Sequence, residues 1–473
     1  MDRDADTNTP MLHPNAPRTS GRKMKQYVAA TSVSLGALCA GTCLAWTSPA
    51  LSQLSILTKT DNSTESFHLT NSEGAAVGGM IAIGALISAI PAGFLADKFG
   101  RKKIIFFVSL MFLLNWLLII FAQNSATLIA GRIFAGIGTG AICVVGPMYI
   151  GEIAESSVRG ILGAFINMFL CTGILLTCVF GSFTTWRVLS MILAAVPVIF
   201  GASFLFMPET PVYLVKISNL QRAEKTLLGL RGSNYDIHTE LKDIQKEIDN
   251  SHKNSASIKD IFTSKANRRA FMSVVAVLAF QQLCGVNAVV FYTVPIFQAA
   301  GSSLSPNLAG IIIALVQVLS SYVSIFIIEK ANRRFYLMLS SVGMLLFLTA
   351  LGMYFHLKRL NVDISPLGFI PIGSAVMFMI SFSIGYGPIP WLLMGELFAP
   401  EVKGIGNGFA IATNWSCAFL VTYFFPIINN SLGAHISFYI CAGIMALATI
   451  YVAVVVPETR GTTLLEIQQI LNK

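Results

Sequence analysis

Five amide side chains lie within long stretches of the sequence that carry no charge: Gln281, Gln282, Asn287, Gln317 and Asn414. A polar group in an apolar stretch costs free energy unless it meets a partner or a water-filled cavity. An amide donates and accepts hydrogen bonds, as a sugar hydroxyl does. Gln281 and Gln282 are about 100° apart on a helix, and Asn287 lies near the face of one of them. The spacing predicts a shared cavity for a neutral polyol, although any one amide could instead join two helices.

Aromatic residues near these amides in the sequence could supply the other half of sugar recognition, because the C–H face of a pyranose packs on a ring. A lone ring in an apolar stretch usually serves packing, but Trp391 directly follows Pro388 and Pro390. Prolines interrupt a helix and free carbonyl groups, which a membrane tolerates only where they line a cavity. We therefore predict a broken helix before Trp391. The candidate rings are Phe291, Tyr292, Phe382, Trp391 and Trp415.

Membrane-spanning helices must position these residues, because charge is scarce and unevenly placed. The 473 residues are 54% hydrophobic and 12% charged, whereas a soluble protein carries about 25% charge. A span needs about 20 apolar residues, and the uncharged stretches accommodate twelve spans. The sequence predicts an all-α membrane protein with six spans in residues 27–208 and six in residues 270–456.

Basic residues indicate the orientation. Placing both termini in the cytoplasm puts 27 of the 32 Lys and Arg residues on that side, as the positive-inside rule requires, and leaves five, Arg132 among them, on the outer side. The net charge of +9 is then an orientation signal and does not indicate nucleic-acid binding. Residues 1–26 form a polar cytoplasmic leader, and the first span acts as a signal anchor at the plasma membrane. A sequon at Asn62 in the first outer loop predicts glycosylation.

The two sets of six spans repeat each other. Residues 151–160 resemble residues 395–404, and Pro208-Glu209-Thr210 resembles Pro457-Glu458-Thr459. Such repeats build transporters whose site lies between the halves near the middle of the membrane. Residues 209–269 between the halves are expected to form cytoplasmic amphipathic helices, and residues 457–473 a cytoplasmic tail.

Every charged residue that recurs in the two halves falls at a predicted cytoplasmic helix end. We predict that they form a cytoplasmic latch between the halves, although they could also be topology anchors and helix caps. One exposed pair contributes only ~0.2–1 kcal/mol, but several pairs can bias an equilibrium between two states. The predicted latch residues are Asp97, Arg101, Glu152, Arg159, Glu209, Glu329, Arg333, Arg334, Glu396, Lys403 and Glu458.

Motifs along the whole chain resemble the sugar porter family of the major facilitator superfamily. The sequence departs from the family pattern at Glu329, Asn332 and Val212, outside the predicted sugar site. Segments at residues 47–51, 382–387 and 414–417 are similar to the insect facilitated trehalose transporter-like branch. The family motifs are Gly93-Phe-Leu-Ala-Asp97-Lys-Phe-Gly100-Arg101-Lys102, Gly131-Arg132, Pro147-x-Tyr149-x-x-Glu152, Pro208-Glu209-Thr210-Pro211, Gln281-Gln282-Leu-Cys-Gly285-Val-Asn287, Gly387-Pro388-Ile-Pro390-Trp391 and Pro457-Glu458-Thr459-Arg460-Gly461.

The resemblance implies two pseudo-symmetric six-helix bundles and facilitated transport of a sugar such as trehalose or a hexose. It implies that Gln281, Gln282, Asn287 and Asn414 contact the sugar, together with the rings of Trp391 and Trp415. Gln317 falls where glucose facilitators have Asn, and Asn167 falls where they have Gln. Phe291 and Tyr292 match the outer gate of the family.

Acidic residues are absent from the middle of every predicted span, and proton coupling needs a titratable group at depth. Family proton symporters carry an Asp in the first span, where this sequence has none, and Ser383 replaces the Glu of glucose facilitators. We therefore expect uncoupled transport. The alternatives are a proton-coupled sugar or polyol symporter and a transport-inactive sugar sensor.

Enzymatic catalysis is not expected, because no nucleophile, base and acid set occurs at membrane depth. Gly136-x-Gly138-x-Gly140 resembles a nucleotide-binding pattern, but it lies inside a span and predicts close helix packing. The eight cysteines lie in apolar spans and indicate neither disulfides nor a metal site. The expected partners are a small-molecule sugar and the lipid bilayer, with no cofactor and no nucleic acid, and the chain is expected to work as a monomer.

Overall fold

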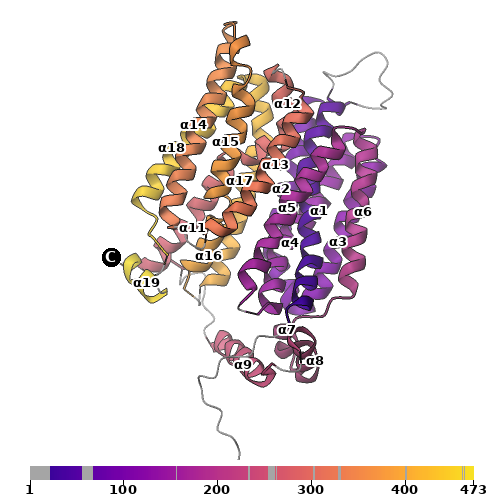
Figure 1. The fold of residues 1–473 in the computed structure, drawn as a ribbon, viewed down its shortest axis with the longest axis vertical. Helices are drawn as coiled ribbons and strands as arrows, with labels where there is room; N and C mark the ends of the chain where they lie inside the picture. The colour runs from indigo at the N-terminus through magenta and orange to yellow at the C-terminus, as the bar shows by residue number, and fades with distance from the viewer. Residues whose placement is uncertain are drawn as a thin grey trace, which may run out of the picture.

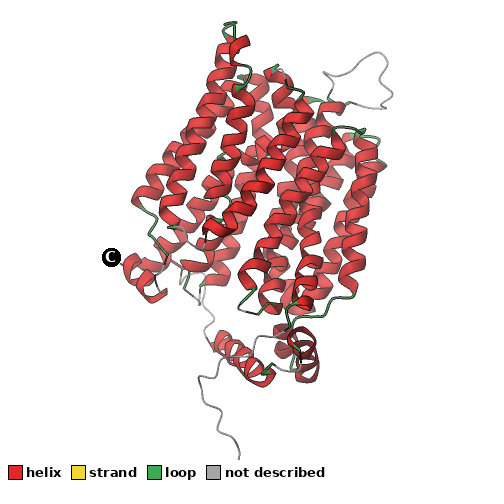
Figure 2. Cartoon of the chain, viewed as in Figure 1, coloured by secondary structure: helices red, strands yellow, loops and turns green. Residues whose placement is uncertain are grey.

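A computed structural model gives the fold, and almost all of what it describes is helical (Figures 1 and 2). Within the described ranges, twelve helical segments are long and apolar enough to cross a membrane, which confirms the predicted number. The predicted residues Asn62 and Glu329 lie outside these ranges. The described residues are 22–55, 68–155, 157–232, 235–253, 261–262, 264–301, 304–328, 332–399, 402–460, 462 and 464–472.

The first six spans form one bundle, drawn from indigo to magenta in Figure 1. Polar side chains begin several of these helices: Thr70 forms a capping box with Glu73, and Asn124 and Thr185 accept hydrogen bonds from the first turn. Gly100, with φ at 99°, makes the tight turn between the second and third helices. The helices are α1 (Met24–Leu54), α2 (Asn71–Phe99), α3 (Arg101–Ile120), α4 (Ser125–Ile153), α5 (Arg159–Gly181) and α6 (Trp186–Leu205).

The last six spans form the second bundle, and two of them are broken. Span seven breaks at Gly285, whose φ of 87° is left-handed. Span ten breaks between Ile384 and Ile389, which confirms the interruption predicted from the two prolines. The helices are α11 (Lys265–Leu283) with α12 (Val286–Ala300), α13 (Pro306–Ile328), α14 (Arg333–Arg359), α15 (Ile370–Ile384) with α16 (Ile389–Glu396), α17 (Lys403–Ser431) and α18 (Ala434–Val454); the short η2 (Ser365–Leu367) precedes α15.

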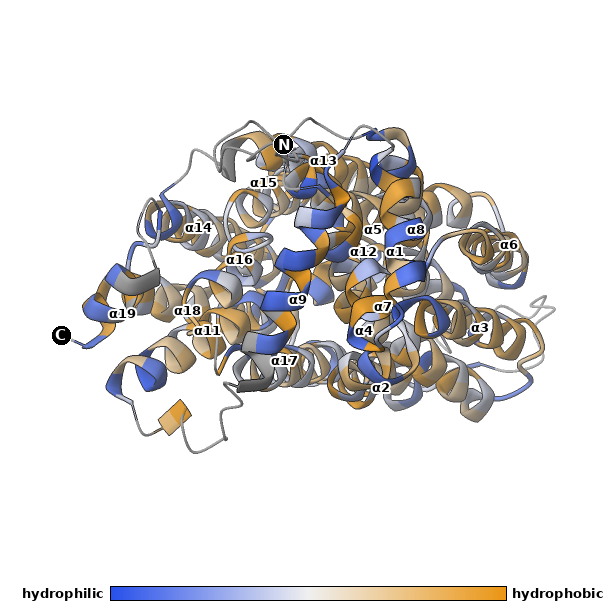
Figure 3. Cartoon of the chain, turned by 90° about the horizontal axis from the view of Figure 1, so that it is seen from below, coloured by the Kyte–Doolittle hydropathy of each residue, from blue (hydrophilic) through white to orange (hydrophobic). Residues whose placement is uncertain are grey.

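Short amphipathic helices lie at one end of the bundle, which we call the lower end (Figures 1 and 3). Leu214, Val215 and Ala223 make a small core with apolar residues of α9. The buried Arg231 pairs with Glu240 at 2.8 Å and donates to the Ile153 carbonyl, which attaches these helices to α4. They are α7 (Pro211–Lys216), α8 (Leu220–Arg231) and α9 (Ile237–Lys253), and α19 (Leu464–Asn472) lies under the second bundle.

One carboxylate outside the spans marks the start of α9. Asp236 accepts hydrogen bonds from the hydroxyl and the backbone N–H of Thr239, as a helix cap does. The Thr239 hydroxyl bond holds the pKa of Asp236 below its ordinary value, because it stabilises the charged form. The helix therefore begins on a carboxylate that stays ionised.

Glycines let α2 and α4 approach within backbone contact. A Cβ added at Gly136 would lie 2.1 Å from the Ile81 carbonyl oxygen and 2.8 Å from the Cα of Gly84. A Cβ at Gly140 would lie 2.3 Å from the Ala85 carbonyl oxygen. The glycine series of α4 thus packs against a neighbouring helix, as the sequence predicted.

Gly136→Ala should destabilise the protein by about 1–3 kcal/mol, because the added methyl group must push two backbones apart. The measurement is the thermal unfolding midpoint of the purified protein in detergent. Gly443→Ala is the control, since a Cβ there meets nothing within 4 Å. Equal midpoints for the two variants would contradict the close packing of α2 and α4.

Candidate functional site

Four of the predicted amides form one chain of hydrogen bonds. Asn287 Nδ2 donates to Gln282 Oε1 at 2.6 Å, and Gln282 Nε2 donates to Asn414 Oδ1 at 3.0 Å. Asn414 Nδ2 then donates to Gln281 Oε1 at 2.9 Å. The cluster joins α11, α12 and α17, so the second bundle brings together residues that are 133 positions apart.

Gln281 ends this chain on the break in span ten. Its Nε2 donates to the Tyr386 carbonyl at 2.7 Å and to the Gly387 carbonyl at 2.9 Å. Both carbonyls lie between α15 and α16, where the helix no longer satisfies them. In the membrane interior such groups need an internal partner. Gln281 therefore holds the broken helix in place.

Gln282 and Asn287 keep the most capacity for a ligand. Both amide protons of Asn414 are used, on Gln281 and on the Leu278 carbonyl, and Asn414 is 1% exposed. Gln282 is 9% exposed, and Asn287 is partly buried. Each uses one amide proton in the chain described above. Gln281 and Asn414 thus position Gln282 and Asn287, whose amides can still form a hydrogen bond with a ligand hydroxyl.

Two further predicted amides lie apart from this chain. Gln317 is buried on α13, and its Oε1 has no hydrogen-bond partner among the described residues. A buried acceptor without a partner costs about 1–3 kcal/mol, which a ligand hydroxyl could recover. Asn167 is exposed on α5 of the first bundle. Since α13 packs against α5, the two residues belong to helices that meet between the halves.

The aromatic side chains predicted to contact the sugar lie in different surroundings. The Phe382 ring lies beside Gly387, 3.5 Å from the position of an added Cβ, and therefore borders the broken helix. Trp391 follows the break on α16 and packs partly buried against the core. Trp415 packs with alanines of α2, so it lies between the halves, and its buried Nε1 has no partner among the described residues.

Tyr292, a residue of the predicted outer gate, lies at the upper end, where α1 ends and α2 begins. Its hydroxyl donates to the Thr422 carbonyl at 2.7 Å, and its ring stacks on Phe425 with centroids 6.3 Å apart. Its φ of −124° bends α12 at this point. The hydroxyl also reaches the first bundle, because an added Cβ on Gly78 would lie 2.2 Å from it. Phe291, beside it, is buried.

A second contact joins the halves at the same end. The Ser48 hydroxyl of α1 accepts a hydrogen bond from the Val294 backbone N–H of α12 at 3.0 Å. A Cβ on Gly79 would lie 3.1 Å from the Tyr423 side chain of α17. The two bundles are therefore packed together at the upper end, around the predicted gate.

The described latch residues form ion pairs inside each half. In the first half, Arg101 pairs with Asp97 at 2.9 Å and with Glu152 at 2.7 Å. In the second half, Arg333 pairs with Glu396 at 3.1 Å. These contacts tie α2 to α4 and α14 to α16. A latch that joins the two halves stays a prediction.

The repeated Glu residues act as helix caps. Glu209 accepts hydrogen bonds from the backbone N–H groups of Arg101 and Lys102, which begin α3. Glu458 accepts from the N–H groups of Arg333 and Arg334, which begin α14. A carboxylate at a helix N-terminus satisfies free donors and complements the helix dipole. The alternative interpretation as helix caps thus describes Glu209 and Glu458.

The other basic latch residues contact carbonyl groups at helix ends. Arg159 donates to the Ala154 carbonyl, and Lys403 donates to the Gly395 carbonyl. Ala154 follows the last residue of α4, and Gly395 is the next-to-last residue of α16, so each basic side chain contacts the end of the helix that precedes it.

Arg132 is a buried cation, although its place in the sequence predicted an outer-side charge. It lies inside the first bundle with no exposed surface. Its guanidinium donates to the Cys43 carbonyl at 2.5 Å, the Thr47 hydroxyl at 2.7 Å and the Val77 carbonyl at 3.1 Å. The Trp46 ring lies 5.6 Å away. Neutral groups of α1 and α2 thus satisfy a charge that a loop position would leave in water.

The family model described as "Sugar (and other) transporter" matches residues 27–471 of the chain. A facilitated trehalose transporter of Culex quinquefasciatus is 36% identical over 98% of this chain and 89% of its own length. A facilitated trehalose transporter of Bombyx mori is 37% identical over 94% of this chain and 87% of its own length. One of Anopheles gambiae is also 37% identical, and this chain spans only 56% of its length.

Solved structures agree on the fold. A partially occluded inward-open structure of the xylose transporter XylE of E. coli has a TM-score of 0.78, with 21% identity over 93% of this chain and 99% of that chain. XylE bound to 6-bromo-6-deoxy-D-glucose, described as a proton:xylose symporter, has a TM-score of 0.75, with 20% identity over 94% and 99%. The predicted major facilitator fold is confirmed.

Gly78→Ala should separate the upper ends of the halves, because the added methyl group takes the space of the Tyr292 hydroxyl. A Ser48→Cys background reports the change, since Ser48 is buried at the same contact. We expect a membrane-impermeant maleimide to label the cysteine several-fold faster in the Gly78→Ala variant. Gly74→Ala is the control, because its Cβ would meet only Leu51 at 3.6 Å. Unchanged labelling would show that Tyr292 does not close this end.

Proposed function

The chain belongs to the sugar transporter family, and we propose that it moves a neutral sugar across the plasma membrane by alternating access. The observation that carries the proposal is the amide chain of Gln281, Gln282, Asn287 and Asn414 beside a broken span. Amides at this depth match the hydroxyls of a sugar, and the adjacent rings match its C–H faces. The names of the relatives favour trehalose as the sugar.

We assign separate roles within the amide chain. Gln282 and Asn287 contact the sugar, since they retain hydrogen-bonding capacity. Gln281 and Asn414 hold them, because their protons are engaged by carbonyl groups and by each other. Gln317 adds a contact from α13 through its unpartnered oxygen.

In this conformation the upper end of the molecule is closed. We assign the upper end to the extracellular side, because Lys and Arg residues concentrate at the other end, as the positive-inside rule predicts for the cytoplasmic side. Tyr292 and Ser48 make that closure. The sugar would then exchange with the cytoplasm. When the upper end opens, the charged residues at the lower end would meet across the halves and form the predicted latch.

Transport is proposed to be uncoupled from protons. Acidic residues of the spans lie at helix ends, with Glu73 in the first turn of α2 and Glu152 in the last turn of α4. The buried guanidinium of Arg132, which contacts α1, is held by two carbonyls and a hydroxyl, and these groups do not titrate in the physiological range. Sugar binding therefore has no carboxylate at depth through which to take up a proton.

Gln282→Ala should raise the KM for uptake of labelled trehalose at least several-fold in proteoliposomes, because a sugar hydroxyl loses its hydrogen-bond partner.

Gln281→Ala should instead lower the free energy of unfolding by about 1–3 kcal/mol, because two buried carbonyls lose their hydrogen-bond partner. Gln245→Ala on α9 is the control for both measurements. If Gln282→Ala transports every sugar of a panel as the unchanged protein does, the assigned site is wrong.

Uptake should be saturable and should stop when the internal and external sugar concentrations are equal. Collapsing a pH gradient should leave the initial rate unchanged, because no acidic group at depth takes up a proton. The measurement is uptake into proteoliposomes with and without a proton ionophore. Accumulation against the sugar gradient, lost on adding the ionophore, would favour the proton-coupled alternative.

A further inference from the structure

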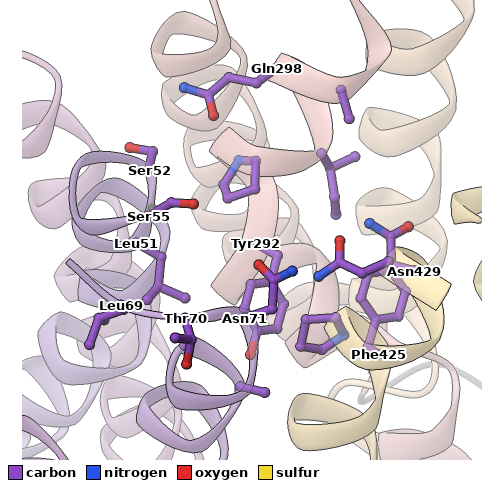
Figure 4. Close-up of a pocket in the computed structure, with 17 residues that line it drawn as sticks. Leu51, Ser52, Ser55, Leu69, Thr70, Asn71, Tyr292, Gln298, Phe425 and Asn429 are labelled. Atoms are coloured by element: carbon purple, nitrogen blue, oxygen red, sulfur yellow. The ribbon is translucent and has the colours of Figure 1, made fainter. Parts of the chain in front are cut away.

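A cavity of about 410 Å³ lies at the upper end between the two halves (Figure 4). The ends of α1 and α2 form one side, and α12 and α17 form the other. Its volume falls in the range of about 300–1,000 Å³ that is typical of small-molecule sites. The cavity opens above the closed gate, because Tyr292 and Phe425 belong to its lining.

The lining of this cavity carries the same chemistry as the amide chain below. Side chains without charge surround it, among them the amides of Asn71, Gln298, Asn429 and Asn430. Asn71 comes from the first half and the other three from the second, so a ligand could touch both. The stacked rings of Tyr292 and Phe425 add an aromatic surface. Amides beside aromatic faces are what a neutral sugar requires.

One polar atom of the lining has no partner. The Oδ1 of Asn429 is buried, and it meets no hydrogen-bond donor among the described residues. Such an acceptor carries a desolvation cost that a hydroxyl from a ligand can offset.

This cavity is separate from the amide chain. Asn429 and Asn414 both lie on α17, 15 residues apart, which corresponds to about 22 Å along a helix. Tyr292 and its bond to Thr422 lie between them. A sugar in the cavity and a sugar at the amide chain would therefore be distinct molecules, one on each side of the closed gate.

We propose that the upper cavity is a second binding site for a neutral sugar, occupied while the gate below it is closed. This inference rests on the proposed function, since it assumes a sugar as the ligand. The site would hold an incoming sugar before the halves rearrange. It would also hold an outgoing sugar after that sugar has passed the gate. In an uncoupled carrier, detailed balance requires the site to change the kcat/KM of entry and exit by the same factor.

Cysteine protection tests the proposal. Asn429→Cys and Asn71→Cys each place a thiol in the cavity, one from each half. A membrane-impermeant maleimide is applied from the upper side with trehalose or with sodium chloride at equal osmolarity. The experiment is repeated with Gln282→Ala added, which removes the lower sugar contact. We expect trehalose to slow labelling several-fold in both backgrounds.

The controls separate local occupancy from conformational change. Phe183→Cys is exposed at the same end but outside the cavity, and its labelling should not respond to trehalose. Protection that disappears in the Gln282→Ala background would come from conformational cycling and would overturn the proposal. Equal labelling with and without trehalose, or protection of Phe183→Cys as well, would overturn it too. If the proposed function itself were wrong, the unchanged protein would not take up sugar at all. An uptake assay without labelling distinguishes this outcome from failure of the second site.

Discussion

The amide chain that ends on the broken span is the interaction on which the rest of this molecule depends. A bilayer supplies no water to satisfy a freed carbonyl, so a helix can break at depth only if a side chain reaches it. Gln281 reaches two such carbonyls. Once it does, its oxygen is available to Asn414, and the remaining amides are fixed in turn. The local break and the polar cluster therefore stabilise each other, and neither would be tolerated alone.

Each half has its own set of charged contacts at the lower end. Glu209 and Glu458 cap equivalent helices, and Arg101 and Arg333 pair with acids of equivalent neighbours. Contacts of this kind keep a half intact while its relation to the other half changes. The duplicated sequence thus encodes two similar rigid units, with the upper contacts around Tyr292 joining them in this conformation.

The number of spans and the break before Trp391 could be predicted from the sequence, because long apolar stretches and paired prolines act locally. The break at Gly285 could not be predicted so easily, since a single glycine in an apolar stretch does not reveal its φ. Arg132 was misplaced because counting charges assumes that they lie in loops, whereas this one is satisfied by α1 and α2. The distinct tasks of Gln281 and Gln282 depend on which carbonyls are near, and that is set by tertiary packing.

Besides its hydrogen bonds, the charge of Arg132 has a consequence for which solutes the protein can accept. It places a fixed positive charge inside the bundle, and Thr47, which it contacts, is one residue from the Ser48 contact of the gate. With an effective dielectric constant of 20, a unit charge 10 Å away feels about 1.7 kcal/mol. A solute bearing an ammonium group would be repelled by roughly that amount, whereas a neutral one would not. A fixed charge in the first bundle would therefore disfavour cationic sugars, such as amino sugars, relative to neutral ones.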